Sequence, residues 1–319
     1  MHRRRFDVRV ILAGMMLMGT GAVSGQNYPD KPIRLITAPP GGPSDLVARV
    51  VAHGLSLNLG QPVIVDNRGA VAIEIAAKTP PDGYSLLFIG SALWLLPLMR
   101  DRVSWDPFRD FLPISMTGRS PTVLAVYPAV PANSVSELIA YAKANPGTLN
   151  YATGARGGAP HLAAELFKAR AHVDIVQIPY KGTGPGLNAL LAGQVQLMFP
   201  SAGAAAPHMK SGRLKILAVT TAQPSALVPG LPTLAASGLP GFEAASINGI
   251  FAPAHTRAMV INRLNREITR VLESADVKER LFNAGVESIG SSPEQFAATI
   301  KSEMAVWGKL IKDVGIRAD

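Results

Sequence analysis

The order of the sequence patterns predicts an α/β protein with two lobes. From residue 33 onward, short β-branched and apolar runs alternate with amphipathic helical runs, which is typical of βαβ units and largely parallel sheets. Proline-rich breaks at 113–121 and 229–240 interrupt this alternation. A chain that leaves one lobe, builds a second and returns makes a hinged pair with a cleft. In such folds, loops at the carboxyl ends of strands bind the ligand.

The elements follow from the spacing of apolar residues. Strands are predicted, in order, at 33–37, 62–65, 84–89, 123–127, 149–153, 174–179, 195–199, 215–220 and 245–252. Helices are predicted at 45–59, 70–78, 161–169, 186–191, 257–282 and 293–314. Ser134 with Glu137, and Ser292 with Gln295, have the spacing of capping boxes, so a helix also begins after Ser134. The strands at 123–127 and 245–252 follow the two breaks and are expected to cross between the lobes.

The first residues have the pattern of a secretory signal. Arg3, Arg4 and Arg5 precede an apolar stretch at 10–23, which ends in the small residues Ala22 and Ser24. An uncleaved anchor is the alternative, but this stretch is shorter than the ~20 residues that span a bilayer. We therefore expect residues 1–24 to be removed. The predicted division is then 25–123 with 248–319 as the first lobe, and 124–247 as the second.

The composition of the remaining chain excludes several classes of protein. Residues 1–24 contain four arginines and one aspartate, so their removal lowers the net charge from +9 to +6. The remaining basic residues do not form runs with interleaved aromatics, so no nucleic-acid partner is expected. There are no cysteines, which excludes disulfides, cysteine–zinc sites and thiol nucleophiles. A cysteine-free exported chain fits a bacterial periplasm.

Three glycine-rich loops each follow a predicted strand and open a helix. They are 39–45, 153–161 and 180–186. Free backbone N–H groups at a helix start, together with the helix dipole, attract anions. One such loop is usually an ordinary tight connection, but three at corresponding strand ends indicate a shared anion pocket. Ser44 is expected to cap the helix that follows, and Asp45 to bond backbone N–H groups or a water molecule.

Other sites are less well supported. The run Gly182 to Gly186 resembles a dinucleotide loop, but no acidic residue lies between Asp174 and Glu243 to hold a ribose. His161 and Glu165 are spaced as two metal ligands, yet no third is apparent, so no metal or cofactor is expected. No nucleophile elbow or P-loop is present. A hydrolase that uses Ser44, Asp45 and His161 stays open as an alternative, although we expect no enzyme.

Eight separate segments of the chain form a characteristic series: "YPDKPIRLITAPPGGPSDLVAR", "LGQPVIVDNR", "PPDGYSLLF", "WDPFRDFLPIS", "LNYATGARGGAPHLAAELF", "VQIPYKGTGPGLNALLAGQVQLMF", "LKILAVTT" and "GIFAPAHT". In order and spacing this series resembles the Bug family, the extracytoplasmic receptors of tripartite tricarboxylate transporters. The resemblance implies a two-lobed, type II-like periplasmic-binding-protein (Venus-flytrap) fold. It also implies capture of a small carboxylate, delivery to a membrane permease and no chemistry on the ligand. We expect a monomer, and a module that feeds a membrane sensor is the remaining alternative.

The resemblance also implies the ligand-binding residues. In the first lobe, main-chain N–H groups and water of one loop hold a carboxylate, here at Pro40, Gly41, Gly42, Ser44 and Asp45. In the second lobe, the matching positions are Thr153, Arg156, Gly157, Gly158, His161, Tyr180, Lys181 and Gly182.

Several positions depart from the family pattern. The glycine-rich loop after Arg68 is shortened, and Gly158-Ala159-Pro160 replaces a run of hydroxyl residues. Arg156 stands at a usually small polar position and is suited to bidentate carboxylate binding. "SALWLL" is expected to place Trp94 near the pocket rim, and Ile247-Asn248 replaces a Trp-Phe pair. Fewer hydroxyls and a nearby tryptophan favour an aromatic or short-chain monocarboxylate over a tricarboxylate.

Overall fold

The computed structural model describes residues 28–37, 39–40, 43–154 and 157–318. The predicted signal at 1–24, together with Gly41, Gly42 and Arg156, lies outside them. Two sheets organise the chain. The six-stranded sheet has the order β11 (Glu287–Ser288), β4 (Phe111–Pro121), β10 (Ala245–Pro253), β3 (Ser85–Gly90), β1 (Ile33–Thr37), β2 (Val63–Asn67). The five-stranded sheet has the order β7 (Val176–Pro179), β6 (Asn150–Thr153), β8 (Leu197–Met198), β5 (Val123–Val126), β9 (Lys215–Val219).

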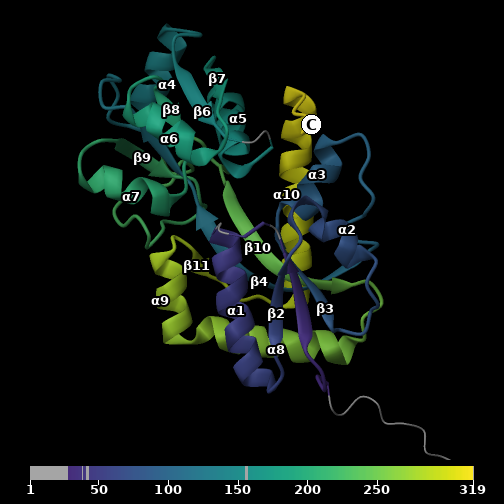
Figure 1. Ribbon diagram of the computed structural model, residues 1–319. Helices are drawn as coiled ribbons and strands as arrows, with labels where there is room; N and C mark the ends of the chain where they lie inside the picture. Colours follow the sequence, from purple (N-terminus) through teal and green to yellow (C-terminus); the bar gives the residue numbers. More distant parts are fainter. Residues whose placement is uncertain (1–27, 38, 41–42, 155–156, 319) are drawn as a thin grey trace, which may run out of the picture.

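Helices pack around both sheets. Those of the first lobe are α1 (Pro43–Leu59), α2 (Ala72–Ala77) after a 3₁₀ turn (Gly69–Val71), α3 (Ala92–Met99), α8 (Ala258–Glu273), α9 (Ala275–Asn283) and α10 (Pro293–Val314). Those of the second lobe are α4 (Val135–Ala144), α5 (Ala159–Ala171), α6 (Thr183–Leu191) and α7 (Ala202–Lys210). Figure 1 shows the two lobes one above the other, with α10 rising from the first to lie near α5. No helix in the described ranges is long and apolar enough to cross a bilayer.

The two-lobed α/β architecture agrees with the prediction, but the sheets are mixed rather than largely parallel. β1 is parallel to β2 and β3, whereas β10 is antiparallel to β3 and β4. In the second sheet, β6 is parallel to β7 and β8, and β5 is antiparallel to β8 and β9. The reversal arises at the strands by which the chain changes lobe, because β10 enters the first sheet from the second lobe and runs opposite to β3.

The expected proline-rich break at 113–121 is instead β4, a strand of 11 residues. Its prolines occupy positions where a missing N–H group costs little. Pro113 lies beside a register shift opposite Phe251, and Pro121 is the last residue of the strand. The chain therefore leaves the first lobe directly after β4, not within the strand that follows.

Two threonines join the outgoing and returning segments between the lobes. Thr220 donates its backbone N–H to the carbonyl oxygen of Thr122 (3.0 Å), and the two hydroxyls are 2.8 Å apart. The backbone N–H of Ala244 in turn donates to the carbonyl oxygen of Thr220 (2.9 Å). Both threonines are buried. These bonds hold the segments side by side where the two sheets connect.

The carboxyl-terminal helices are predicted with mixed success. α10 has the expected bounds, and Ser292 with Gln295 forms a complete capping box. At Ser134 only half of the box forms, because the Glu137 carboxylate accepts from the backbone of Asn133 instead of Ser134. The single helix expected at 257–282 is divided at Ser274, whose hydroxyl accepts from the backbone N–H of Val277 and caps α9.

Trp94 is a core residue and does not lie at a pocket rim. It is fully buried in α3, and its ring packs 6.3 Å from that of Phe251 and 6.2 Å from that of Phe296, measured between centroids. Its Nε1 donates to the Glu303 carboxylate of α10 (2.9 Å). The apolar run around Trp94 is therefore a helix packed inside the first lobe.

Candidate functional site

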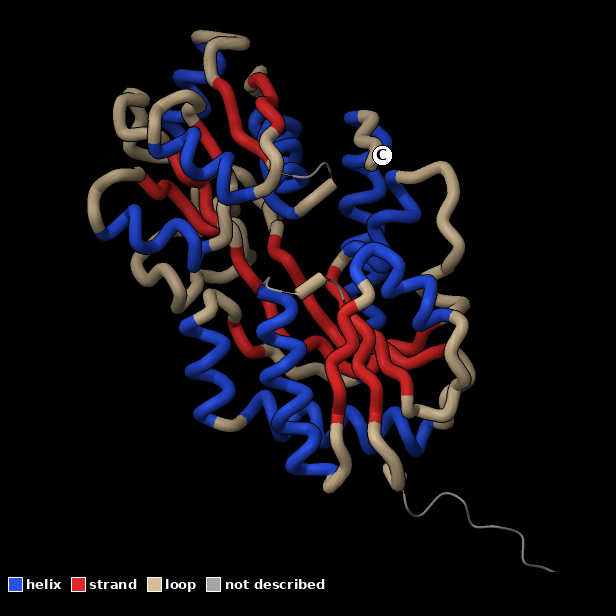
Figure 2. Tube along the Cα trace, viewed as in Figure 1, coloured by secondary structure: helices blue, strands red, loops and turns tan. Residues whose placement is uncertain are grey.

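The first predicted anion loop joins β1 to α1. Figure 2 shows that the end of β1 and the start of α1 lie on the side of the first sheet that faces the second lobe. Pro40 is exposed there. Because α1 begins at Pro43, Ser44 lies within the first helical turn and does not occupy the expected cap position before it.

Asp45 connects α1 to the end of β2. One of its carboxylate oxygens accepts from Arg49 Nε (3.0 Å) and the other from Asn67 Nδ2 (2.9 Å). Arg49 also donates to Asn67 Oδ1 (3.0 Å). Side chains supply these two partners, and bonds from Asp45 to backbone N–H groups or water stay a prediction. The negative charge of Asp45, which would repel an anionic ligand, is compensated by Arg49.

Ser44 contacts a residue that the sequence analysis did not place in the site. Its hydroxyl donates to Oδ1 of Asn248 in β10 (3.2 Å). Asn248 is only 5% exposed. A buried asparagine in the otherwise apolar run "INGIFAP" is the signal that would have identified it, since buried amides need partners.

The two glycine-rich loops of the second lobe lie against each other. The backbone N–H of Tyr180 donates to the carbonyl oxygen of Thr153 (2.8 Å). A methyl group at Gly154 would lie only 3.1 Å from the carbonyl carbon of Gly182. Thr153 itself is fully buried, and its hydroxyl accepts from Gln177 (3.0 Å). Glycine at position 154 thus permits the close approach of the loops.

His161 stabilises the start of α5. Its Nδ1 accepts from the backbone N–H of Gly157 (3.0 Å), while Gly158 is the residue before the helix. Gly157 has a φ of 74°, in the left-handed region that favours glycine. This loop reaches the first lobe, because a methyl group at Gly157 would lie 2.6 Å from Met99 Sδ.

The catalytic and metal alternatives receive no support from these contacts. The Ser44 hydroxyl is bonded to Asn248 and His161 Nδ1 to Gly157, so the described bonds do not pair serine with histidine. Glu165 accepts from the Tyr151 hydroxyl and from Lys168 Nζ (2.9 Å). Within the described ranges no three metal-binding side chains cluster.

Lys181 differs from Asp45, the charged residue of the first loop. It is exposed, and within the part of the chain that the structure describes it has no hydrogen-bond acceptor or ion-pair partner. The neighbouring Tyr180 packs against the apolar cluster of the second lobe. The lysine ammonium group is therefore available to an anion at the end of β7.

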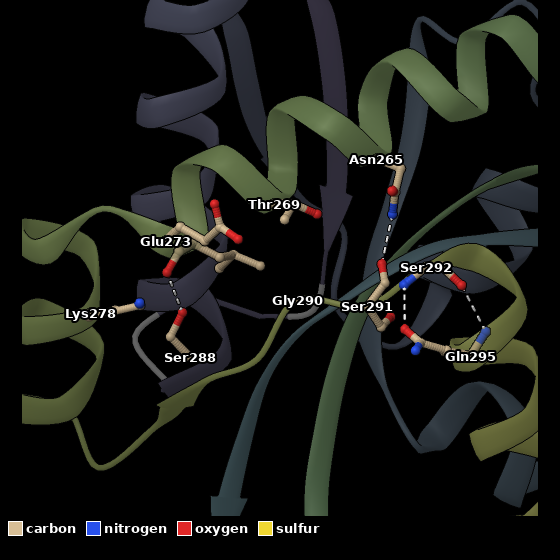
Figure 3. A pocket seen from close by; sticks show the side chains of 10 residues that line it. Asn265, Thr269, Glu273, Lys278, Ser288, Gly290, Ser291, Ser292 and Gln295 are labelled. Carbon is tan, nitrogen blue, oxygen red and sulfur yellow. Dashed lines mark hydrogen bonds between the residues drawn. The ribbon is translucent and has the colours of Figure 1, made fainter.

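A cavity of about 470 Å³ lies elsewhere in the first lobe, between α8, α9 and the start of α10 (Figure 3). Several of its polar side chains form bonds within the fold. Asn265 donates to the carbonyl oxygen of Ser291 (2.7 Å), and Ser288 donates to that of Leu272 (2.9 Å). None of the predicted ligand-binding residues lines it, so it is not the candidate site.

Comparisons with known proteins identify the family. The model of the tripartite tricarboxylate transporter family receptor matches residues 47–316. Protein BugT of Bordetella pertussis is 37% identical over 303 residues, which cover 92% of this chain and 93% of BugT.

Solved structures with bound carboxylates are also similar. R. palustris Rpa4515 with adipate superposes with a TM-score of 0.77 and 34% identity, covering 91% of this chain and 99% of that one. MatC from Rhodopseudomonas palustris with bound malate superposes with a TM-score of 0.71 and 28% identity, covering 89% of this chain and 100% of that one. The chain therefore belongs to the family of tripartite tricarboxylate transporter receptors, which includes Bug proteins and has the two-lobed fold of periplasmic solute-binding proteins.

Proposed function

We propose that this protein captures a small carboxylate between its lobes in the periplasm and delivers it to a tripartite-type membrane permease. The leader at 1–24 would direct export. Residues 25–123 with 248–319 would form one half of the receptor, and 124–247 the other. The joined segments at Thr122 and Thr220 would act as the hinge, and the receptor would work as a monomer without cofactor or chemistry on the ligand.

The distribution of charged residues around the three loops is the observation that supports the proposal. The charge of Asp45, the acidic residue of the first loop, is compensated by Arg49, and its carboxylate also accepts from Asn67. Lys181, at the end of a second-lobe strand, has no acidic partner in the described ranges. The chain between Asp174 and Glu243 contains no acidic residue. This distribution of charge favours an anion held by the loop 39–45 on one side and by the loops 153–161 and 180–186 on the other.

The ligand we propose is a short-chain monocarboxylate. The expectation of an aromatic ligand depended on Trp94 lying near the pocket rim, but Trp94 is buried. The replacement of hydroxyl residues by Gly158-Ala159-Pro160 still favours a ligand with fewer polar groups than a tricarboxylate. Adipate and malate, bound by the relatives Rpa4515 and MatC, support a carboxylate in general.

Thermal melting against a panel of carboxylates tests this function. The full-length gene is expressed, the protein is recovered from the periplasmic fraction, and melting is followed with aliphatic, hydroxy, oxo, aromatic and tricarboxylic acids. A ligand at 100 times its dissociation constant stabilises the native state by about 2.7 kcal/mol, so the midpoint rises clearly. A midpoint unchanged by every carboxylate would contradict the proposal. Ester or amide turnover that Ser44→Ala abolishes would support the hydrolase instead.

A further inference from the structure

We propose that Asn248 recognises a second oxygen of the ligand, and that the ligand is a short 2-hydroxy or 2-oxo monocarboxylate. This inference rests on the proposed function, since it concerns the first-lobe half of the same site. Three residues support it: Asn248 with its buried side-chain amide, Ser44 of α1, which donates to that amide, and Gly90 beside it.

The side chain of Asn248 lies on the sheet face that α1 covers. Side chains alternate along a strand, so Asn248 and Ile250 share one face while Ile247 and Phe251 share the other. Ile250 belongs to the apolar cluster with the α1 residues, and Ile247 and Phe251 belong to the cluster on the opposite face. The bond from Ser44 to Asn248 Oδ1 confirms this orientation. Asn248 therefore lies beneath the first turn of α1.

In the side-chain amide of Asn248, only the oxygen has a hydrogen-bond partner among the described residues. Oδ1 accepts from Ser44 (3.2 Å), and the backbone carbonyl accepts from the Thr117 hydroxyl (3.2 Å). Nδ2 has no acceptor among the described residues. Within those residues, the fully enclosed side-chain atoms without a hydrogen bond are Thr37 Oγ1 and Arg263 Nε, and the latter is ion-paired with Glu267. Nδ2 of Asn248 is not among these enclosed atoms, and 5% of the residue is exposed, so we infer that a ligand can reach this donor.

Gly90 makes room for this amide. Gly90 pairs with Asn248 across the β3–β10 ladder, and a methyl group at Gly90 would lie 2.9 Å from Asn248 Oδ1. Any side chain there would displace the amide from its bond to Ser44. The position of the free N–H donors is thus determined by two strands and one helix, which is the preorganisation that a specific binding site needs.

The chemistry of the free group defines the ligand. An amide nitrogen donates to oxygen and carries no charge, so it suits a hydroxyl or carbonyl oxygen. Nδ2 lies next to Ser44 in the proposed carboxylate loop, so the accepted oxygen belongs near the carboxylate, on the adjacent carbon. A ligand without that oxygen would bury the N–H group unpaired, and sites built for a polar group discriminate strongly against such analogues.

Matched ligand pairs test the inference by titration calorimetry. The pairs are lactate and pyruvate against propionate, and 2-hydroxybutyrate and 2-oxobutyrate against butyrate. We expect the wild-type protein to bind the oxygenated member at least about tenfold more tightly. Asn248→Leu, of similar volume, should lose this preference by weakening only the oxygenated member. Asn262→Leu, at an exposed position of α8, should behave as wild type.

The outcomes separate this inference from the proposed function. Equal affinity of the wild type for both members of a pair overturns the role of Asn248. So does an equal loss for both members in Asn248→Leu, which would indicate a structural role. Binding of another carboxylate but no member of these pairs rejects the ligand class while the receptor function stands. Binding of no carboxylate at all rejects the proposed function. If Asn248→Leu does not fold, the wild-type comparison of each pair still decides.

Discussion

The two lobes hold their loops by different means. At the start of α1, side chains bond to side chains: Asp45 to Arg49 and Asn67, and Ser44 to Asn248. In the second lobe, bonds that involve the backbone hold the loops, from Tyr180 to Thr153 and from Gly157 to His161, and Lys181 keeps its charge free within the described ranges. The first lobe thus determines shape and the second contributes charge. Loss of the Asp45 network in the first lobe should therefore lower stability, whereas loss of the Lys181 charge in the second should alter binding alone.

The largest effect is expected for Asp45→Ala. This change removes the bonds from Arg49 Nε and Asn67 Nδ2 to the carboxylate, and hydrogen bonds to charged groups are worth about 1.5–3 kcal/mol each. The free energy of unfolding, measured by urea denaturation, should fall by about 3 kcal/mol. The control Asp313→Ala removes an exposed ion pair with Lys309 and should cost less than about 1 kcal/mol. Equal costs for the two variants would contradict the role of the Asp45 network.

A pH-dependent stability is expected where the lobes meet. A cavity of about 370 Å³ is lined by Glu303 of α10, Glu243 and Arg119. Arg119 is paired with Glu287. The pKa of Glu303 is raised from 4.5 to about 7, chiefly because the carboxyl group is buried. The hydrogen bond from Trp94 opposes this rise, the charge of Glu243 contributes to it, and the hydrogen bond from Trp307 opposes it.

The sign follows from proton linkage. The folded pKa of Glu303 exceeds the unfolded one, so the folded state binds more protons between about pH 4.5 and 7. The free energy of unfolding is therefore highest below that window. It falls as the pH rises through the window, by about 2 kcal/mol after allowance for solvent screening. Denaturation at several pH values should show this slope in wild type and in the exposed Glu279→Gln control, but not in Glu303→Gln. A slope that persists in Glu303→Gln would assign it to another group.

A smaller effect, on binding alone, is expected for Lys181→Gln. Removal of one exposed charge near an anion changes its affinity by about 1 kcal/mol, or about fivefold. Calorimetry with the best carboxylate should show weaker binding and a weaker dependence on salt, while the melting midpoint of the free protein stays unchanged. Lys210→Gln, at an exposed position of α7 in the same lobe, is the control. A lower midpoint for the free Lys181→Gln protein would show that the loop needs the lysine for folding.

The smallest effect is expected for Thr37→Val in the first lobe. The Thr37 hydroxyl is buried at the end of β1 and has no partner in the described residues. Its removal should leave the free energy of unfolding unchanged or raise it by up to about 1 kcal/mol. Thr117→Val, which removes a donor to the Asn248 carbonyl, should lower it by about 1 kcal/mol. A loss of stability in Thr37→Val as large as in Thr117→Val would mean that Thr37 has a partner in solution.

Local signals in the sequence predict much of the fold. β1 and α10 have the expected bounds because a continuous apolar run and a Ser-Pro-Glu-Gln start are unambiguous. β4 is missed because its prolines suggest a break, and only the pairing with β10 shows that they fall at tolerated positions. The burial of Trp94 likewise depends on α10, about 200 residues away in sequence.

The candidate site is predicted only in part. The glycine-rich loops are apparent from sequence because each follows a strand and opens a helix. Their contacts are not, since Ser44 with Asn248 and Gly154 with Gly182 join residues far apart in the chain. The Asn248 substitution is visible as a departure from the family, but its meaning depends on Gly90 and Ser44, which only the fold brings to it.

The most direct test of the receptor function is calorimetric titration of the wild-type protein with the carboxylate that raises the melting midpoint most. The account predicts saturable binding of one molecule per chain, weakened by Asn248→Leu in the first lobe and by Lys181→Gln in the second. Saturable binding that neither variant weakens would contradict capture between the two lobes. The absence of binding by any carboxylate would contradict the receptor function itself.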